Sequence, residues 1–272
     1  MGVPNNLFNG IVLSMCMHTP KFPGNDFTFR VDGNTVLAVP TEKRVRAFMK
    51  EGVLADSVNV LILRIPGKPV IYSFPSMDVR LSAMEKDGEG SDELGKYASY
   101  SMKENGRVIA GLAKLYRETP EGMQGLHDRV ILDWTSVDRW MEEEENVMVH
   151  PRDPYTRIDV LESSRKVEIR MKGVKIAESS RPMMLFETGL PARYYVPPKD
   201  VEMEFLVPSR HETRCPYKGK ASYWDIRIEG ETFKNMAWSY LEPFGESRKI
   251  KGYFCFYTER LDGMTVDGKE IE

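Results

Sequence analysis

Short segments in which apolar and polar residues alternate recur along the chain. KVEIRM (166–171) and DVEMEFLV (200–207) alternate between apolar and polar residues, while ASYWDIRIEG (221–230) and GYFCFYTERL (252–261) are rich in aromatic and β-branched residues. Alternation with a period of two is typical of half-buried strands, and aromatic and β-branched residues favour strands. Glycines and prolines separate these segments at turn-like intervals. The pattern therefore predicts a mainly β protein.

Windows with helical periodicity are scarce. The best helical candidates are SVDRWMEEEEN (136–146) and ETFKNMAWSY (231–240). We therefore expect few helices, and short ones, within the β architecture.

The chain contains the same pattern twice. Residues 43–79 align with residues 165–201 without a gap at an offset of 122, and the match resumes later at an offset of 124. Internal repeats of this kind indicate copies of one structural unit, most strongly where glycine and proline fix the backbone. Four glycines and prolines are identical in the two aligned copies: Gly67 aligns with Gly189, Pro69 with Pro191, Pro75 with Pro197 and Gly95 with Gly219.

The repeat predicts the domain organisation. We expect two tandem copies of a small closed or tent-like β domain, at residues 41–160 and 161–272. Residues 1–40 form an N-terminal arm, in which FTFRVDGNTVLAV (27–39) is typical of a hairpin around Asp32, Gly33 and Asn34.

The two copies differ in their reactive residue types. In the alignment Cys215 to Lys218 stand against Ser91 to Leu94, Glu187 against Ile65, Trp238 against Lys114, and Tyr257 against Asp133. Positions that both copies share are expected to be architectural. Polar and aromatic residues peculiar to the second copy therefore indicate a site there.

The stretch RCPYKG (214–219) is the first candidate. Arg214 and Lys218 flank Cys215, and neighbouring cations lower the pKa of a thiol and make it a better nucleophile. Arg214 and Lys218 also suit an anionic group such as a carboxylate or a phosphate. The alternatives are a buried cysteine that acts as a small hydrophobe and a solvated basic loop.

Further candidates surround this stretch in the second copy. Glu187 ends an apolar run, where it acts either as a general acid/base or in a structural ion pair with Lys218 or Arg193. The aromatic residues either line an apolar pocket with polar tips or form ordinary core. We take Glu187, Cys215 and Lys218 as catalytic candidates, and as ligand-binding candidates Arg193, Tyr195, Arg214, Tyr217, Trp238, Tyr240 and Tyr257.

Four motifs of the second copy carry a family resemblance. FETGLPARYYVPPKDV, TRCPYKGKASYW, AWSYLEP and GYFCFYTERLD follow one another in this order within residues 161–272. This copy resembles the family known as domain of unknown function 427, which some catalogues place under a nucleotidyltransferase heading. The resemblance implies a compact, mainly β domain and little about chemistry. The first copy resembles the degenerate partner of tandem members.

The segment between the copies also resembles a family element. HPRDPY (150–155) contains two prolines that make it rigid. We interpret it as a strap between the copies in which Arg152 and Asp153 form ion pairs.

Composition narrows the function classes. The chain of 272 residues is 41% hydrophobic and 29% charged, with a net charge of −3, which argues against a general nucleic-acid binder. No apolar run approaches the ~18 residues of a membrane span and no secretory leader is evident, so we expect a cytoplasmic protein. Three widely spaced cysteines without a CxxC pair predict neither a disulfide framework nor a common zinc site.

Three functions remain open. The first is binding or processing of a small molecule with an anionic group in a pocket of the second copy. The second is metal-dependent nucleotidyl transfer, although the chain has no GxxxxGK[ST] loop, no GxGxxG and no clear pair of metal-binding aspartates. The third is a non-catalytic module that binds a protein partner. The sequence indicates no cofactor and leaves open whether the chain forms a homo-oligomer.

Overall fold

A computed structural model describes residues 27–31, 34–50 and 52–271 and divides the chain into two compact units, with the boundary between Asn146 and Val147. In this part of the chain strands dominate, and every helix is a short 3-10 turn. The prediction of a mainly β protein with few short helices is confirmed.

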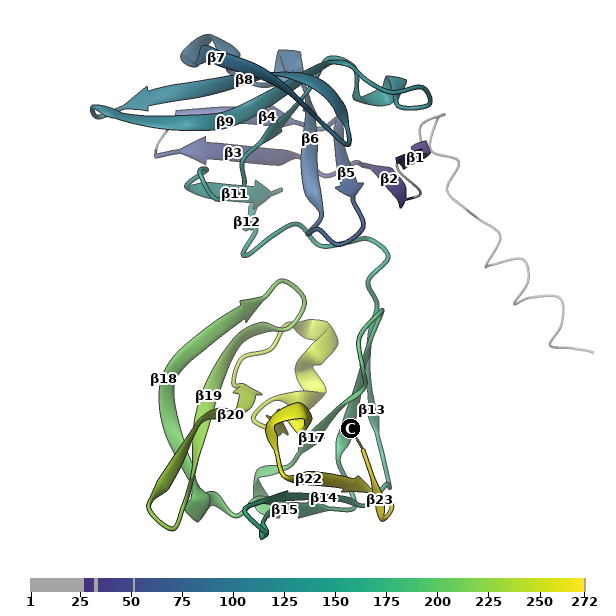
Figure 1. The fold of residues 1–272 in the computed structure, drawn as a ribbon, viewed down its shortest axis with the longest axis vertical. Coiled ribbons are helices and arrows are strands. Elements are labelled where there is room, and N and C mark those ends of the chain that lie inside the picture. Colours follow the sequence, from purple (N-terminus) through teal and green to yellow (C-terminus); the bar gives the residue numbers. More distant parts are fainter. Residues whose placement is uncertain (1–26, 32–33, 51, 272) are drawn as a thin grey trace, which may run out of the picture. The chain divides into compact units, whose positions relative to one another are not determined.

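The first unit consists of two antiparallel sheets (Figure 1). Their strand orders are β1-β2-β5-β6-β10-β9-β8-β7 and β12-β11-β3-β4. The strands are β1 (Phe27–Val31), β2 (Asn34–Thr41), β3 (Val45–Met49), β4 (Gly52–Ser57), β5 (Val60–Arg64), β6 (Ile71–Pro75), β7 (Glu85–Asp92), β8 (Gly95–Glu104), β9 (Arg107–Glu118), β10 (Arg129–Leu132), β11 (Arg139–Glu142) and β12 (Glu145–Asn146). The 3-10 helices are η1 (Ser76–Asp78), η2 (Leu81–Ala83) and η3 (Gln124–Leu126).

The second unit repeats this plan. Its sheets have the orders β13-β16-β17-β21-β20-β19-β18 and β15-β14-β22-β23. The strands are β13 (Ile158–Glu162), β14 (Val167–Met171), β15 (Val174–Ser179), β16 (Met183–Glu187), β17 (Arg193–Val196), β18 (Leu206–Cys215), β19 (Gly219–Ile228), β20 (Glu231–Tyr240), β21 (Phe254–Phe256), β22 (Gly263–Val266) and β23 (Lys269–Glu270). The 3-10 helices are η4 (Pro198–Asp200), η5 (Met203–Phe205), η6 (Gly245–Ile250) and η7 (Thr258–Arg260).

Apart from β1, the strands correspond one to one between the units. The order β2-β5-β6-β10-β9-β8-β7 of the first large sheet recurs as β13-β16-β17-β21-β20-β19-β18 in the second. In the first unit β1 extends the sheet, because it pairs antiparallel with β2 and places Val31 opposite Asn34. Over the described residues none of the four sheets closes on itself, so the closed alternative of the predicted domain is excluded.

Residues shared by the two copies serve the architecture. The Ser57 hydroxyl donates to the Asp78 carboxylate at 2.6 Å, and the equivalent Ser179 hydroxyl donates to Asp200 at 2.7 Å. Each contact joins the end of a small-sheet strand to the 3-10 turn that follows β6 or β17. A short polar bond of this kind fixes how the chain passes from one sheet to the other.

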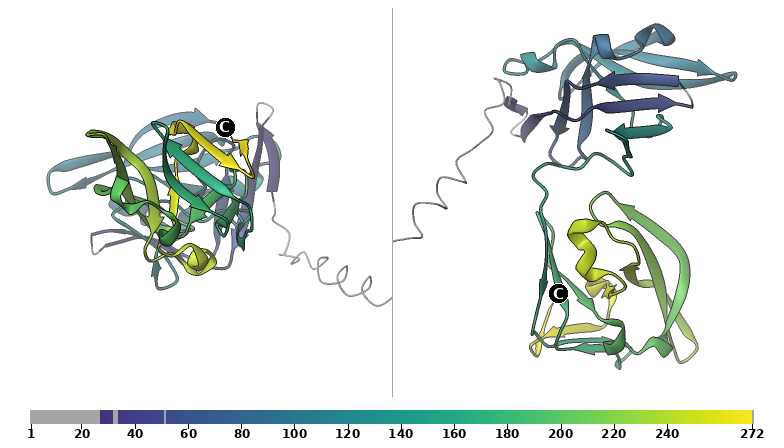
Figure 2. Two further views of the ribbon diagram at one scale, coloured as in Figure 1. Left: turned by 90° about the horizontal axis from the view of Figure 1, so that it is seen from below. Right: turned by 180° about the vertical axis from the view of Figure 1, so that it is seen from behind.

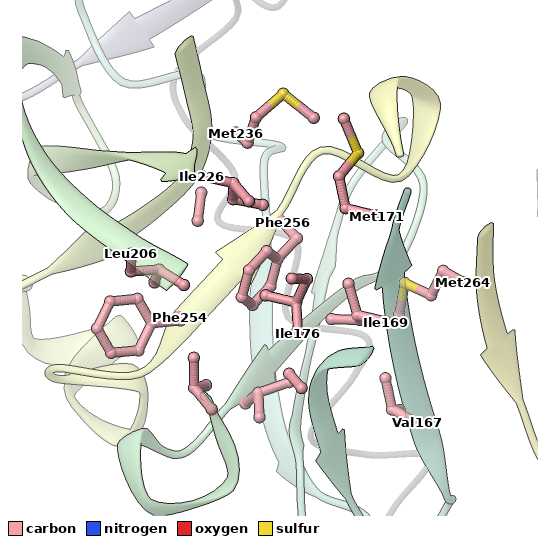
Figure 3. Close-up of a cluster of buried hydrophobic side chains, with 14 of the residues drawn as sticks. Val167, Ile169, Met171, Ile176, Leu206, Ile226, Met236, Phe254, Phe256 and Met264 are labelled. Atoms are coloured by element: carbon pink, nitrogen blue, oxygen red, sulfur yellow. The ribbon is translucent and has the colours of Figure 1, made fainter. Parts of the chain in front are cut away.

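The core of the second unit lies between its two sheets (Figure 3). Val167 and Ile169 of β14 face Phe254 and Phe256 of β21, and Ile226 of β19 joins the same cluster. The alternation in KVEIRM directs its apolar residues into this cluster, as expected for a half-buried strand.

Both helical candidates are wrong. Residues 136–146 contain β11 and β12, and residues 231–240 form β20. β11 pairs with β3 and buries Trp140 and Met141, while β20 lies between β19 and β21. Pairing with neighbouring strands overrides the modest helix propensity of these segments.

Truncation of the core should show how much the second unit depends on it. Phe256 is 2% exposed, and its replacement by alanine should lower the free energy of unfolding by about 3–5 kcal/mol. Phe186→Ala is the matched control, because Phe186 is 40% exposed in the same unit. Denaturant titration measures both, and equal effects of the two variants would contradict this assignment of the core.

Candidate functional site

One face of the large sheet of the second unit gathers most of the predicted site residues. Side chains alternate along strands, so this face is opposite the core of Figure 3. The buried cluster on it consists of Val160, Leu185, Tyr195, Ala221, Tyr223, Trp238, Tyr240, Ile250 and Cys255. We call its aromatic members, together with the half-buried Tyr257, the aromatic face: Tyr195, Tyr223, Trp238, Tyr240 and Tyr257.

A buried ion pair belongs to this side of the sheet. The Lys218 ammonium lies 2.5 Å from the Glu187 carboxylate, and each side chain is 11% exposed. Glu187 is the last residue of β16, and Lys218 is in the turn between β18 and β19. The sequence predicted that Glu187 acts either as a general acid/base or in an ion pair with Lys218 or Arg193. The structure contains the ion pair with Lys218.

The pair bridges strands that are not neighbours. In the large sheet β17, β21 and β20 lie between β16 and β19. Glu187 and Lys218 meet because the sheet is strongly curved: Figure 1 and Figure 2 show β18, β19 and β20 bending around the yellow coil of η6. A flat sheet would hold the two residues on strands about 19 Å apart.

The equivalent positions of the first unit are apolar. Ile65 follows β5 where Glu187 ends β16, and Leu94 precedes Gly95 as Lys218 precedes Gly219. Ile65 and Leu94 are 7% and 2% exposed and belong to one hydrophobic cluster. The same fold therefore fills these two positions either with an ion pair or with two aliphatic side chains.

The turn before β19 corrects one part of the sequence alignment. Cys215 lies opposite Gly219 in its ladder, and Asp92 lies opposite Gly95 in the equivalent ladder. Cys215 therefore corresponds to Asp92 and not to Ser91, because the turn of the second unit contains one additional residue. Gly219 has a φ of +96° and a Cβ there would lie 3.2 Å from a backbone oxygen, which explains why glycine is used.

Hydrogen bonds order the aromatic face. The Trp238 indole N–H donates to the Tyr195 hydroxyl at 3.2 Å. The Tyr223 hydroxyl lies 3.0 Å from the Thr213 hydroxyl and 3.4 Å from the Tyr257 hydroxyl. The rings of Trp238 and Tyr257 are 4.6 Å apart between centroids, so the face is a connected polar and aromatic surface.

Arg193 borders this surface. Its guanidinium makes two contacts of 3.1 Å with the Glu259 carboxylate and lies 5.7 Å from the centroid of the Trp238 ring. Hydrogen bonding to Arg193 is the main cause that lowers the pKa of Glu259 to about 2. Because Glu259 already neutralises Arg193, Lys218 and Arg193 are both paired with a carboxylate in this structure.

Burial raises the pKa of two weakly acidic groups of the face, the Cys255 thiol and the Tyr240 phenol. It raises the pKa of the Cys255 thiol to about 12, so this thiol is protonated at neutral pH. Burial is also the main cause that raises the pKa of Tyr240, and the nearby Cys215 and Glu187 add to it. Cys215 is half-buried at the end of β18 and packs against the cluster that contains Tyr240.

Two predicted residues lie apart from the face. Arg214 is exposed, and strand alternation directs it away from the side on which Thr213 meets Tyr223. The Tyr217 hydroxyl accepts a hydrogen bond from the backbone N–H of Asp153 at 2.7 Å. Neither side chain joins the buried cluster.

Sequence reasoning missed three members of the site. Tyr223 contacts the predicted Tyr257, Glu259 contacts the predicted Arg193, and Thr213 contacts Tyr223. Tyr223 follows the strand alternation of ASYWDIRI and could have been found by that pattern. Thr213 and Glu259 depend on which strands become neighbours, which one sequence does not reveal.

No metal site or membrane helix is evident in the described part of the chain. Among residues 27–31, 34–50 and 52–271, no three His, Cys, Asp or Glu side chains come together in a way that could hold a metal ion. None of the helices in these ranges is long and apolar enough to span a membrane.

Two segments of the chain match a known protein family. Residues 37–143 and residues 159–267 each match the family model described as Domain of unknown function (DUF427), whose short label is NTP_transf_9. A search of curated proteins finds no match.

The low pKa of Glu259 provides a pH test. A carboxyl group with a lowered pKa in the folded state stabilises the fold above its unfolded pKa of about 4.5, and this stabilisation is lost as the pH falls towards about 2. In Arg193→Gln the Glu259 pKa should rise towards its ordinary value. NMR titration of the side-chain carboxyl measures it, with Arg157→Gln as control, since Arg157 pairs with Asp159. An unchanged Glu259 pKa in Arg193→Gln would refute the assigned cause.

Proposed function

The chain belongs to the DUF427 family, since the family model matches most of its length in two segments, and on this premise we propose that the second unit binds a small molecule with an anionic group. The Lys218 ammonium would contact the anionic group, and the aromatic face would contact the body of the ligand. Glu187, Cys215 and Lys218 are the groups we assign to any chemistry on that ligand.

The observation that carries the proposal is the ion pair in place of Ile65 and Leu94. Buried ion pairs are often no more stabilising than apolar side chains of similar volume, because desolvation offsets the attraction of the charges. The first unit shows that the fold accepts the apolar solution. Stability alone therefore gives no reason for Glu187 and Lys218, and ligand binding does.

The Lys218 ammonium has unused capacity for a ligand. An ammonium carries three N–H donors, and within the described residues Glu187 is its one hydrogen-bond acceptor. The side chain is 11% exposed, so few water molecules can reach the other donors. An anionic group that enters here would take these donors and share the cation with Glu187.

The surroundings suit the organic part of a ligand. Trp238 and Tyr257 are close enough for their rings to form one apolar surface, and Tyr257 is half-buried. Aromatic rings bury much area and keep polar tips for orientation. The hydroxyls of Thr213, Tyr223 and Tyr257 supply such polar groups at the same surface.

The one observation that supports nucleotidyl transfer is the label of the family model. For the binding of a protein partner, the described residues show single exposed apolar side chains and no more. A nucleoside triphosphate with magnesium therefore belongs in the ligand screen beside simple carboxylates and phosphates. Stabilisation by the nucleotide alone, dependent on magnesium, would favour nucleotidyl transfer.

The screen is a thermal-shift experiment on the wild type and on Lys218→Ala. We expect at least one anionic compound to raise the melting temperature of the wild type but not of the variant, because a ligand that binds the folded state stabilises it. Lys68→Ala is the control, since Lys68 forms an exposed ion pair with Glu93 in the first unit. If the same compound also stabilises Lys218→Ala fully, the proposed contact is wrong.

A second prediction separates function from stability. Lys218→Leu alone leaves Glu187 buried and unpaired and should cost about 3–5 kcal/mol. The double variant Glu187→Ile/Lys218→Leu reproduces the first unit and should unfold at the same denaturant concentration as the wild type or a higher one, yet bind no ligand. A double variant as unstable as Lys218→Leu would show that the ion pair is needed for folding.

A further inference from the structure

The segment that enters the second unit lies against the proposed site. HPRDPY (150–155) lies within residues 147–157, the whole of which we now call the strap; these residues directly follow the last residue of the first unit and precede β13. Pro151 and Pro154 restrict its backbone. Within the second unit the strap contacts Tyr217, which precedes Lys218 in the sequence, and Thr188, which follows Glu187.

Arg152 makes the central contacts of the strap. Its Nε donates to the carbonyl oxygen of Pro216 at 2.8 Å. The guanidinium also lies 3.4 Å from the Glu246 carboxylate and 5.2 Å from the centroid of the Phe244 ring. One side chain therefore holds the turn before Lys218 together with the start of η6.

Neighbouring contacts act on the same turn. The backbone N–H of Asp153 donates to the Tyr217 hydroxyl at 2.7 Å, and the His150 ring meets the Tyr217 ring edge-on. The backbone N–H of Phe244 donates to the carbonyl oxygen of Lys218 at 3.3 Å. The turn is thus held at consecutive residues by the strap and by the chain before η6.

The far end of the strap is bonded beside Glu187. The backbone N–H of Arg157 donates to the Thr188 hydroxyl at 3.0 Å, and the Thr188 N–H donates to the Arg157 carbonyl at 3.1 Å. These bonds use the backbone of Arg157, whose side chain is 78% exposed. One continuous segment therefore joins the residue after Glu187 to the residues before Lys218.

We propose that the strap positions Lys218 in its ion pair with Glu187, with Arg152 as the positioning residue, and so holds the ammonium in the geometry in which it binds an anionic ligand. The ligand part of this inference rests on the proposed function. A turn between two strands has few contacts of its own, and the affinity of a site increases when its charged group is held in the bound geometry. Arg152 acts on Lys218 through the backbone of Pro216 and needs no contact with the ligand.

Competitive acylation of lysines in the full chain, read by mass spectrometry, tests the proposal without a ligand. Lys220 is the internal reference, because its side chain is 48% exposed and it lies two residues from Lys218. In the wild type Lys218 should react much more slowly than Lys220. Arg152→Ala should raise the rate of Lys218 relative to Lys220 by about tenfold.

Arg157→Ala is the matched control, since it removes an arginine of the same strap and leaves the backbone bonds to Thr188. It should leave the relative rate of Lys218 unchanged. Tyr217→Phe removes the acceptor of the Asp153 N–H and should raise the rate less than Arg152→Ala does; it decides the question if Arg152→Ala does not fold. Equal relative rates in the wild type, Arg152→Ala and Tyr217→Phe would overturn the proposal.

The ligand screen separates the two proposals. A compound that stabilises the wild type should bind more weakly to Arg152→Ala and with full affinity to Arg157→Ala. If no compound binds while Arg152→Ala still exposes Lys218, the proposed function fails and the positioning role stands. If ligand affinity and the Lys218 rate are both unaffected by Arg152→Ala, the positioning role fails and the proposed function stands.

Discussion

A buried ion pair across a curved sheet is the constraint on which the candidate site depends. Glu187 ends β16 and Lys218 directly precedes β19; β17, β21 and β20 separate these two strands, and the side chains meet because the sheet bends. Two charges removed from water are costly unless they stay paired. Any motion that flattened the sheet would separate the charges, so the pair and the curvature depend on each other. The same curvature brings the aromatic face, the Cys215 thiol and the turn of Lys218 into one neighbourhood.

The repeat made much of the fold predictable from the sequence. Identities at glycine, proline, serine and aspartate lie where the backbone turns or where a polar bond joins the sheets, as Ser57 and Ser179 show. Alternation predicted β14 for the same reason, because half-buried strands expose every second residue. It was wrong for most of DVEMEFLV (200–207), where Met203–Phe205 form η5 and β18 begins only at Leu206. The two helical candidates failed because sheet pairing is a long-range property. Nothing in residues 231–240 alone reveals that neighbouring strands will lie on both sides of them.

The site was predictable in composition but not in geometry. Reactive side chains peculiar to the second copy identified Glu187, Cys215 and Lys218, and the pairing of Glu187 with Lys218 was one of two named alternatives. The sequence could not choose between Lys218 and Arg193, because each choice depends on how far the sheet bends. It also placed Cys215 one residue out of register, since an additional residue in a turn changes which side chains lie opposite each other. Arg214 was included among the ligand-binding candidates because it is adjacent to Cys215 in the sequence. Strand alternation directs its side chain away from the aromatic face.

The two units differ at one pair of equivalent buried positions, and this difference is the physical basis of the proposed function. The large sheets of both units have the same succession of strands. In the second unit Glu187, at the end of β16, is buried with Lys218 from the turn before β19. In the first unit Ile65, just after β5, is buried in one cluster with Leu94 from the turn before β8. In the first unit these two positions are occupied by Ile65 and Leu94, whose burial stabilises the fold by removing apolar surface from water. The other retains two charges there, beside hydroxyls and aromatic rings, and a strap fixes the chain next to each charge. Stability alone does not account for the two charges. The second unit departs from the apolar arrangement at the position where we propose that the desolvated Lys218 ammonium binds an anionic ligand.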